Sequence, residues 1–278
     1  MSQRTRRALL RGTTVAAITG LAGCGTTGST GSSEQTEATT AGTETVSSTS
    51  TAAPETSTES AATAEPTTTV SSAPITPPLH AASETTKFDV NLAGVPIVGS
   101  ADATLDLYYW SDYQCPFCQK FEHRTLPKLV RTHVADGNVR IPLLQFPNIG
   151  ENSTTLSVMS RCVWRQTREN NPEAFWNWHA TVFEEQGFPN GDWSKRSNLL
   201  ELTGGVDGVD ASVVESCLNE NRDAIVADIE AERKRGKKAG LDGTPSFVLF
   251  DPEADTAVDL QGAQPYSRFD SKIRSLLE

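Results

Sequence analysis

The segment from residue 25 to residue 86 most limits what this chain can fold into. Ser or Thr occupies 30 of its 62 positions, Glu occupies seven, and Lys and Arg are absent. A segment with so few apolar side chains cannot bury enough surface to offset the entropy of ordering its backbone, so we predict a disordered linker. The residues that can form a core are therefore confined to 87–278, a length that suits one domain.

The charge of the chain divides along the same boundaries. Residues 1–24 carry +4, the linker carries −7, and residues 87–278 carry −8 of the formal net charge of −11. Binding to a phosphate backbone requires clustered Lys and Arg, so we expect no nucleic-acid partner. No stretch reaches the ~18 to 20 apolar residues of a spanning helix, so we expect any membrane attachment to be through lipid alone.

Residues 1–24 resemble an export signal. The stretch 5–11, Thr-Arg-Arg-Ala-Leu-Leu-Arg, precedes a modestly apolar run and is similar to a twin-arginine signal. The sequence Leu-Ala-Gly-Cys that ends at Cys24 resembles a lipobox, in which cleavage leaves that cysteine as a lipidated N-terminus. A basic leader with an ordinary cysteine is the alternative, and the joint occurrence of the two motifs favours the lipoprotein. We expect an extracytoplasmic protein, anchored to the outer face of the cell membrane by lipid on Cys24.

The sequence Cys-Pro-Phe-Cys at 115–118 carries the chemistry. Residues 104–110 are rich in β-formers and predict a strand, 111–114 predict a turn, and apolar residues then recur at helical spacing. Pro116 fits the first turn of that helix, which places Cys115 at its N-terminus, where unpaired amides and the helix dipole stabilise a thiolate. Cys118 lies one turn later and can resolve a mixed disulfide formed at Cys115.

Zinc binding is the main alternative for such a cysteine pair. A structural zinc site needs four ligands, usually from a second cysteine pair or a histidine pair. The other candidate ligands are scattered and lack ligand spacing: Cys162, Cys217, His123, His133 and His179. The pattern therefore favours redox chemistry, and we expect neither a metal nor another cofactor.

The surroundings of the pair resemble a known family. Residues 110–121, Trp-Ser-Asp-Tyr-Gln-Cys-Pro-Phe-Cys-Gln-Lys-Phe, are similar to the active-site stretch of DsbA-like thiol–disulfide oxidoreductases, in which Pro116 and Phe117 complete the motif. Gly-Thr-Pro at 243–245 resembles the family's loop. The resemblance covers about residues 98–278. It implies an α/β thioredoxin fold, βαβ followed by ββα, with a helical insertion at about 151–239.

The same resemblance assigns a role to the second motif. It implies that the bond between Thr244 and Pro245 is cis and that Pro245 faces the cysteine pair across a substrate groove. The backbone of Thr244 would then be free to pair with a substrate strand.

The remaining elements follow from periodicity. We predict further strands at 139–146, 246–250 and 256–261, and helices at 153–167, 172–185, 194–203 and 211–238. Pro142 suggests an edge position or a bulge for its strand, and Pro127 is expected to kink or break the first helix. Phe175, Trp176, Trp178 and His179 are expected to pack in the core of the insertion.

Cys162 and Cys217 each lie on an apolar helical stripe. They are either two buried free thiols or a structural disulfide, and export to an oxidising compartment favours the disulfide. Closing a loop of about 55 residues would stabilise the fold by about 4 kcal/mol.

The resemblance implies an enzyme that exchanges disulfides with exported proteins through a mixed disulfide at Cys115. It also implies a monomer with a membrane quinone-linked oxidase as electron partner. A reductase or isomerase, and a non-catalytic thioredoxin-like binding module, remain alternatives. Two departures argue against strong oxidising power but leave the exchange chemistry intact: Phe117 replaces the histidine of strongly oxidising relatives, and Tyr108 and Tyr109 stand where many relatives carry a buried acid. We therefore expect proton transfer at Cys118 to use water or another group.

Overall fold

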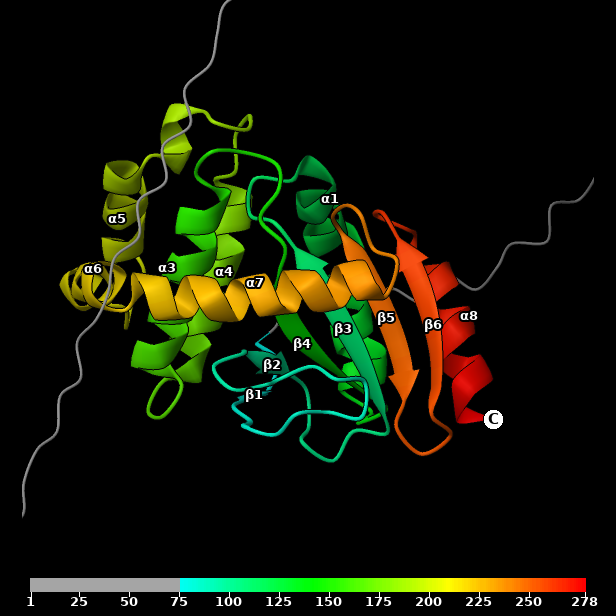
Figure 1. Ribbon diagram of the computed structural model, residues 1–278. Helices are drawn as coiled ribbons and strands as arrows, with labels where there is room; N and C mark the ends of the chain where they lie inside the picture. Colours follow the sequence, from blue (N-terminus) through cyan, green and yellow to red (C-terminus); the bar gives the residue numbers. More distant parts are fainter. Residues whose placement is uncertain (1–75) are drawn as a thin grey trace, which may run out of the picture. The chain divides into compact units, whose positions relative to one another are not determined.

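The computed structural model describes residues 76–278. The predictions that fall before residue 76, namely the export signal, the lipid on Cys24 and most of the linker, lie outside the described residues. The described part is built on one six-stranded sheet with the strand order β1-β2-β4-β3-β5-β6, and helices cover both of its faces (Figure 1). Within residues 76–278, no helix is long and apolar enough to cross a bilayer.

The elements have the following bounds. The strands are β1 (Leu79–His80), β2 (Ile97–Val98), β3 (Leu105–Ser111), β4 (Val139–Gln145), β5 (Ser246–Asp251) and β6 (Thr256–Gln261). The α-helices are α1 (Pro116–Arg124), α2 (Leu126–Leu129), α3 (Ser153–Thr167), α4 (Pro172–Glu184), α5 (Arg196–Gly204), α6 (Ala211–Glu220), α7 (Arg222–Lys238) and α8 (Tyr266–Leu277). The π-helical turn η1 (Val130–Val134) follows α2, and the 3-10 turn η2 (Asp192–Ser194) precedes α5.

Two successive units form the centre of the fold. β3, α1 and β4 form a βαβ unit in which the two strands pair in parallel, with Tyr109 opposite Leu143. β5, β6 and α8 form a ββα unit, and β5 also pairs antiparallel with β3, with Tyr109 opposite Phe247. This arrangement is a thioredoxin fold, so the predicted fold class is confirmed. The central strand β3 leads directly into the turn that carries the cysteine pair.

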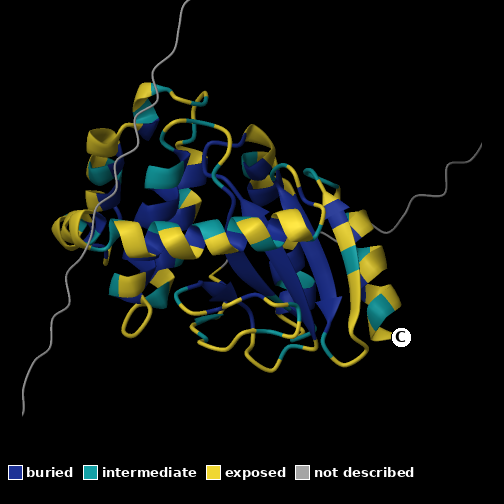
Figure 2. Cartoon of the chain, viewed as in Figure 1, coloured by how far each residue is buried: buried dark blue, intermediate teal, exposed yellow. Residues whose placement is uncertain are grey.

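Successive side chains of a strand point to opposite faces of the sheet, so the neighbouring aromatic residues of β3 lie on different faces. Leu107 and Tyr109 join the core that includes α1 and α8. Tyr108 and Trp110 join the core on the other face, where Trp110 donates its indole N–H to the Glu232 carbonyl of α7 at 3.0 Å. The central strands are accordingly buried throughout, while the helices expose their outer sides (Figure 2).

The structured part of the chain begins before the boundary predicted at residue 87. Residues 76–86 were expected in the linker, but β1 pairs antiparallel with β2, with Leu79 opposite Val98. The Gly99 N–H also donates to the Pro78 carbonyl at 2.8 Å. Main-chain hydrogen bonds to a strand edge hold this segment, and composition does not report such bonds.

Helices α3 to α7 lie between β4 and β5, in the interval where the insertion was expected. The single helix predicted over 211–238 is instead two helices, α6 and α7, which meet at Asn221. Asn221 has φ −113° and ψ 3°, outside the helical region, and its side chain accepts a hydrogen bond from Arg165 at 3.2 Å. Asparagine is a weak helix former, and here a contact with another helix holds its side chain at the break.

The two prolines behave differently. Pro127 lies just after the break between α1 and α2, as expected. The edge position predicted for Pro142 is wrong, because β4 lies between β2 and β3. Pro142 is tolerated there because β2 is only two residues long and the next residue, Leu143, donates its N–H to the Pro96 carbonyl at 3.0 Å.

Two links fix α3 inside the insertion. Cys162 of α3 and Cys217 of α6 form a disulfide with a Cα–Cα distance of 5.8 Å. Arg161 of α3 places Nη2 2.7 Å from Oε1 of Glu232 on α7, and both side chains are buried. The helical insertion is thus joined to the helix that covers the second face of the sheet.

Candidate active site

Cys115 occupies the N-terminal cap of α1, directly after the turn that ends β3. Its backbone is extended, with φ −84° and ψ 116°, and Pro116 is the first helical residue. Proline suits this position because the first helical N–H groups have no intrahelical partner. The sulfur of Cys115 therefore faces the free amides of the first turn.

Asp112 fixes the turn that precedes Cys115. Its Oδ1 accepts the Gln114 N–H at 2.8 Å, and its Oδ2 accepts the N–H groups of Asn148 and Ile149 at 2.8 and 2.9 Å. The Cys115 N–H donates to the Asp112 carbonyl at 3.0 Å. The fully buried carboxylate thereby joins the active-site turn to the loop after β4.

Gln114 joins the same turn to the helical insertion. Its Nε2 donates to Ser153 Oγ at 3.0 Å, at the start of α3, and its Oε1 accepts the Asn190 N–H at 2.7 Å. Sequence reasoning treated residues 111–114 only as a turn and missed the roles of Asp112 and Gln114. Their position between a strand and the cysteine pair is the one signal that pointed to them.

The loop before β5 approaches Cys115 from the other side. The Thr244–Pro245 peptide bond is cis. Cys115 Sγ lies 3.2 Å from the Thr244 carbonyl oxygen, a hydrogen-bonding distance for the thiol. Pro245 is buried and Thr244 is half-buried. The structure thus brings together Cys115, Thr244 and Pro245, which the sequence placed in one site.

The two thiols of the pair differ in environment and therefore in pKa. Hydrogen bonding from Cys118, followed by Thr244 and the amides of Cys118 and Phe117, lowers the pKa of Cys115 to about 6, although burial opposes this shift. Burial raises the pKa of Cys118 well above its usual range. At neutral pH the first cysteine is a thiolate that can attack, and the second is a protonated thiol.

Apolar side chains surround the site at the surface. Phe117, between the two cysteines, is 61% exposed, and Phe188 is 91% exposed. Phe188 lies in the loop that reaches Gln114 through Asn190, and Ile149 lies in the loop held by Asp112. Three exposed apolar residues therefore belong to segments that bond directly to the active-site turn.

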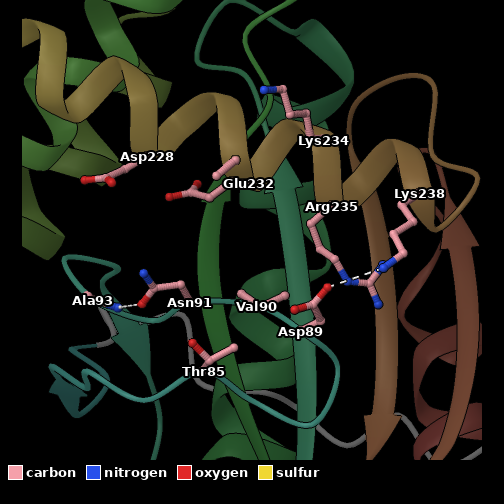
Figure 3. Close-up of a pocket in the computed structure, with 11 residues that line it drawn as sticks. Thr85, Asp89, Val90, Asn91, Ala93, Asp228, Glu232, Lys234, Arg235 and Lys238 are labelled. Carbon is pink, nitrogen blue, oxygen red and sulfur yellow. Dashed lines mark hydrogen bonds and ion pairs between the residues drawn. The ribbon is translucent and has the colours of Figure 1, made fainter.

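A pocket of about 410 Å³ lies elsewhere, between the N-terminal segment and α7. Figure 3 shows its lining side chains, which come from residues 85–93 and from α7 and include no cysteine. Lys238 pairs with Asp89 there at 3.4 Å. None of the lining residues belongs to the active-site turn, to α1 or to the loop that carries Thr244 and Pro245. Among residues 76–278, no group of His, Cys, Asp and Glu side chains is arranged to hold a metal ion.

Comparisons with known proteins agree with this geometry. A family model described as "Thioredoxin" matches residues 92–265, more than half of the chain. "Disulfide bond formation protein D" of Bacillus subtilis (strain 168) is 22% identical over 161 residues, which are 58% of this chain and 70% of that protein.

Solved structures show the same fold. Oxidised BdbD from Bacillus subtilis matches with a TM-score of 0.55 and 20% identity, covering 70% of this chain and 97% of that chain. DsbA from Chlamydia trachomatis matches with a TM-score of 0.57 and 17% identity, covering 72% and 97%.

Proposed function

The chain belongs to the thioredoxin family and is a thiol–disulfide oxidoreductase, and we propose that it forms disulfides in exported proteins through a mixed disulfide at Cys115. The observation that carries this proposal is the position of Cys115. Its sulfur lies at the start of α1, at 3.2 Å from the carbonyl oxygen of the cis Thr244–Pro245 bond.

The reaction proceeds by two exchanges of sulfur bonds. A client thiolate attacks Cys115 Sγ of the oxidised pair, the bond to Cys118 breaks, and Cys118 leaves and takes up a proton. A second client thiolate then attacks the client sulfur bonded to Cys115, and Cys115 leaves as a thiolate. The client gains a disulfide and loses two electrons, which remain on the reduced cysteine pair.

The pKa of Cys115 supports this direction. A leaving thiol with a pKa of about 6 is a good leaving group at neutral pH, and stabilising its thiolate stabilises the reduced enzyme. The client then retains the disulfide. A reductase that donates electrons to clients would be favoured by a less stable thiolate at Cys115, which makes the reduced enzyme less stable.

Exposed apolar residues support unfolded clients as substrates. Phe117, Ile149 and Phe188 are among the few large apolar side chains exposed within residues 76–278, and all three lie in segments bonded to the active-site turn. Newly exported chains expose apolar residues beside their cysteines, whereas folded proteins bury most of them.

The trapping experiment tests the assignment of roles. With Cys118→Ala, Cys115 can still attack a client disulfide and form a mixed disulfide, but the thiol of Cys118 that would attack Cys115 Sγ and expel the client is missing. We expect client complexes to accumulate on non-reducing gels and to disappear when a reductant is added. Cys115→Ala is the matched control and should accumulate none. Equal accumulation in both variants would contradict the assigned roles, and no complex in either would favour a non-catalytic binding module.

Attachment through lipid on Cys24 would keep the enzyme beside its electron partner. A reduced pair must be reoxidised after each cycle, and a membrane quinone-linked oxidase is the expected acceptor. We expect Cys24→Ala to move the protein from the membrane fraction to the soluble fraction, since one lost anchor removes most of the membrane affinity. Fractionation followed by immunoblotting measures this, and unchanged membrane association would contradict the anchor.

A further inference from the structure

We propose that Glu122, with Tyr109 and His179, forms the proton path of Cys118, which exchanges its proton with a solvent-filled pocket between α1, α2 and α4. This inference rests on the proposed thiol–disulfide exchange, in which Cys118 must gain or lose one proton in every cycle. Tyr109 stands on β3 at a place where many relatives in the resembled family carry a buried acid. The structure supplies the acid from α1 instead.

Glu122 lies on the buried face of α1, four residues after Cys118. Residues at this spacing lie one above the other on a helix, with Cβ atoms about 5 to 6 Å apart. Glu122 is 8% exposed and Cys118 is fully buried. A carboxylate in such a position is costly unless a partner or a proton neutralises it.

Tyr109 is the neighbour that Glu122 and Cys118 share. It is fully buried in the core that contains Cys118. Burial, then the charge of Glu122 and the charge of Cys118, raise the pKa of its phenol well above the usual range. The phenol therefore stays protonated, and a protonated hydroxyl can accept one proton while it donates another. It can connect the two groups without itself becoming charged.

His179 on α4 meets Glu122 from the insertion. Its Nε2 lies 3.2 Å from Glu122 Oε1, and its Nδ1 lies 2.8 Å from the Tyr113 hydroxyl, which donates to Ser160 Oγ at 3.0 Å. With Tyr113 donating to Ser160, its oxygen accepts from Nδ1–H, and Nε2 then faces a carboxylate oxygen. The imidazole nitrogen and the carboxylate oxygen are thus close enough to pass a proton between them.

Three buried polar atoms of this cluster lack a hydrogen-bond partner within residues 76–278. The Tyr109 hydroxyl, Glu122 Oε1 and His179 Nε2 make no hydrogen bond of good geometry there. Buried polar groups in native proteins are nearly always bonded, so exceptions call for an explanation. A path that transfers a proton between groups needs polar atoms that can change their hydrogen-bond partners.

A pocket of about 430 Å³ connects the cluster to solvent. Glu122 and His179 line it, its walls are mostly apolar, and the exposed His123 and Glu184 also line it. Its lining comes from α1, α2, η1 and α4, and α1 is in contact with both α2 and α4. Water in this pocket can take up the proton of the Glu122–His179 pair while the apolar walls keep Cys118 dry.

The charged and titratable groups that face the cluster come from every element packed against it. They are Tyr109 of β3, Tyr113 of the active-site turn, Cys118 and His123 of α1, Arg131 of η1, Arg161 of α3, whose charge acts on Tyr113, and Glu184 of α4. Only Glu122 and His179 combine burial, mutual contact and access to the pocket.

The step can be measured in one turnover. The Cys115 thiolate of the reduced full-length chain attacks Ellman's reagent and breaks its disulfide, which forms a mixed disulfide with thionitrobenzoate and releases a first coloured thiolate. Cys118 then loses its proton to Glu122 and attacks Cys115 Sγ, the bond to thionitrobenzoate breaks, and a second coloured thiolate leaves. Stopped-flow absorbance from pH 5 to pH 9 gives the rate of this second release.

We expect Glu122→Gln to slow the release by on the order of 100-fold at pH 6 to 7, the usual contribution of a positioned acid or base. The rate of release by this variant should rise about tenfold per pH unit, because hydroxide replaces the missing proton acceptor. The ratio of the wild-type rate to the variant's rate should therefore fall toward pH 9. Alkylation of Cys115 by iodoacetamide should stay within about twofold of wild type, because the thiolate of Cys115 does not use this path.

Two further variants complete the test. Tyr109→Phe keeps the ring and its packing but removes the hydroxyl, and it should slow the release in the same pH-dependent way, including if Glu122→Gln fails to fold. Glu185→Gln removes an exposed carboxylate at the C-terminal end of α4 that does not line this pocket, and it should behave as wild type. Equal rates for wild type and both cluster variants, or a slowing that is the same at every pH, would overturn the proton path. Failure of wild type to release thionitrobenzoate would instead contradict the proposed exchange.

Discussion

Arg161→Met should lower the free energy of unfolding by about 3 to 5 kcal/mol, because it leaves a buried carboxylate without its partner. Arg161 Nη2 bonds both oxygens of Glu232 at 2.7 and 2.8 Å, and Nη1 donates to the Leu143 carbonyl at 3.2 Å. Glu232 also accepts the Gln145 N–H at 2.7 Å. Burial already raises the pKa of this carboxyl despite the arginine, so removing the arginine leaves little to hold its charge.

Urea unfolding of the variants measures this loss. Arg161→Met with Glu232→Gln should recover most of it, since the neutral amide needs no counter-charge and still accepts from Gln145. Arg233→Met is the matched control on the same helix, because Arg233 pairs with Glu230 at 3.1 Å in a partly exposed position. That variant should lose less than about 1 kcal/mol. A similar loss of unfolding free energy in Arg161→Met and Arg233→Met would show that burial does not make the Arg161–Glu232 pair more important for stability than an exposed pair.

The reduced enzyme should gain stability over the oxidised enzyme as the pH rises from 6 to 9. In the folded reduced protein the pKa of Cys115 is about 6, below its ordinary value of 9.0. The folded state therefore binds fewer protons than the unfolded state in this window, and stability rises with pH. The full shift corresponds to about 4 kcal/mol, and solvent screening at a thiolate that clients must reach reduces our expectation to roughly 2 kcal/mol.

Comparison of the two redox forms isolates this effect, because other titrating groups are common to both. Urea unfolding of each form at several pH values gives the difference directly. The gain should be lost as the pH falls through 6. Above pH 9 it should decline, since the raised pKa of Cys118 favours the unfolded state there. A difference that does not change with pH would remove the support for disulfide formation as the direction of the enzyme.

The local features of the site could be predicted because neighbouring residues decide them. A strand of β-formers, a turn and Pro116 at the first helical position place Cys115 at the helix cap, and the structure has Pro116 as the first residue of α1. Helix α3 and strand β6 also have the predicted bounds. Periodicity and capping act over one or two turns of chain, so a single sequence records them.

Buried charges could not be predicted in the same way. Nothing in the local sequence distinguishes the buried Glu122 from its exposed neighbour His123. Arg161 and Glu232 are charged residues, and charged residues usually lie in solvent. The C-x-x-C-x-x-x-E spacing was visible, but nothing local shows that this glutamate turns toward β3. The break at Asn221 likewise depends on a contact with Arg165 from another helix.

The sequence by itself determined the four longer strands, the first helix and its two cysteines, and the family resemblance added the loop that faces them. Only the tertiary structure decided which groups surround Cys118 and how residues 76–86 are held. It brought Tyr109 from β3 and His179 from α4 to Glu122 on α1. The physical reason is that burial and pairing are through-space properties. They depend on which distant elements pack together, whereas capping and periodicity depend on the adjacent chain.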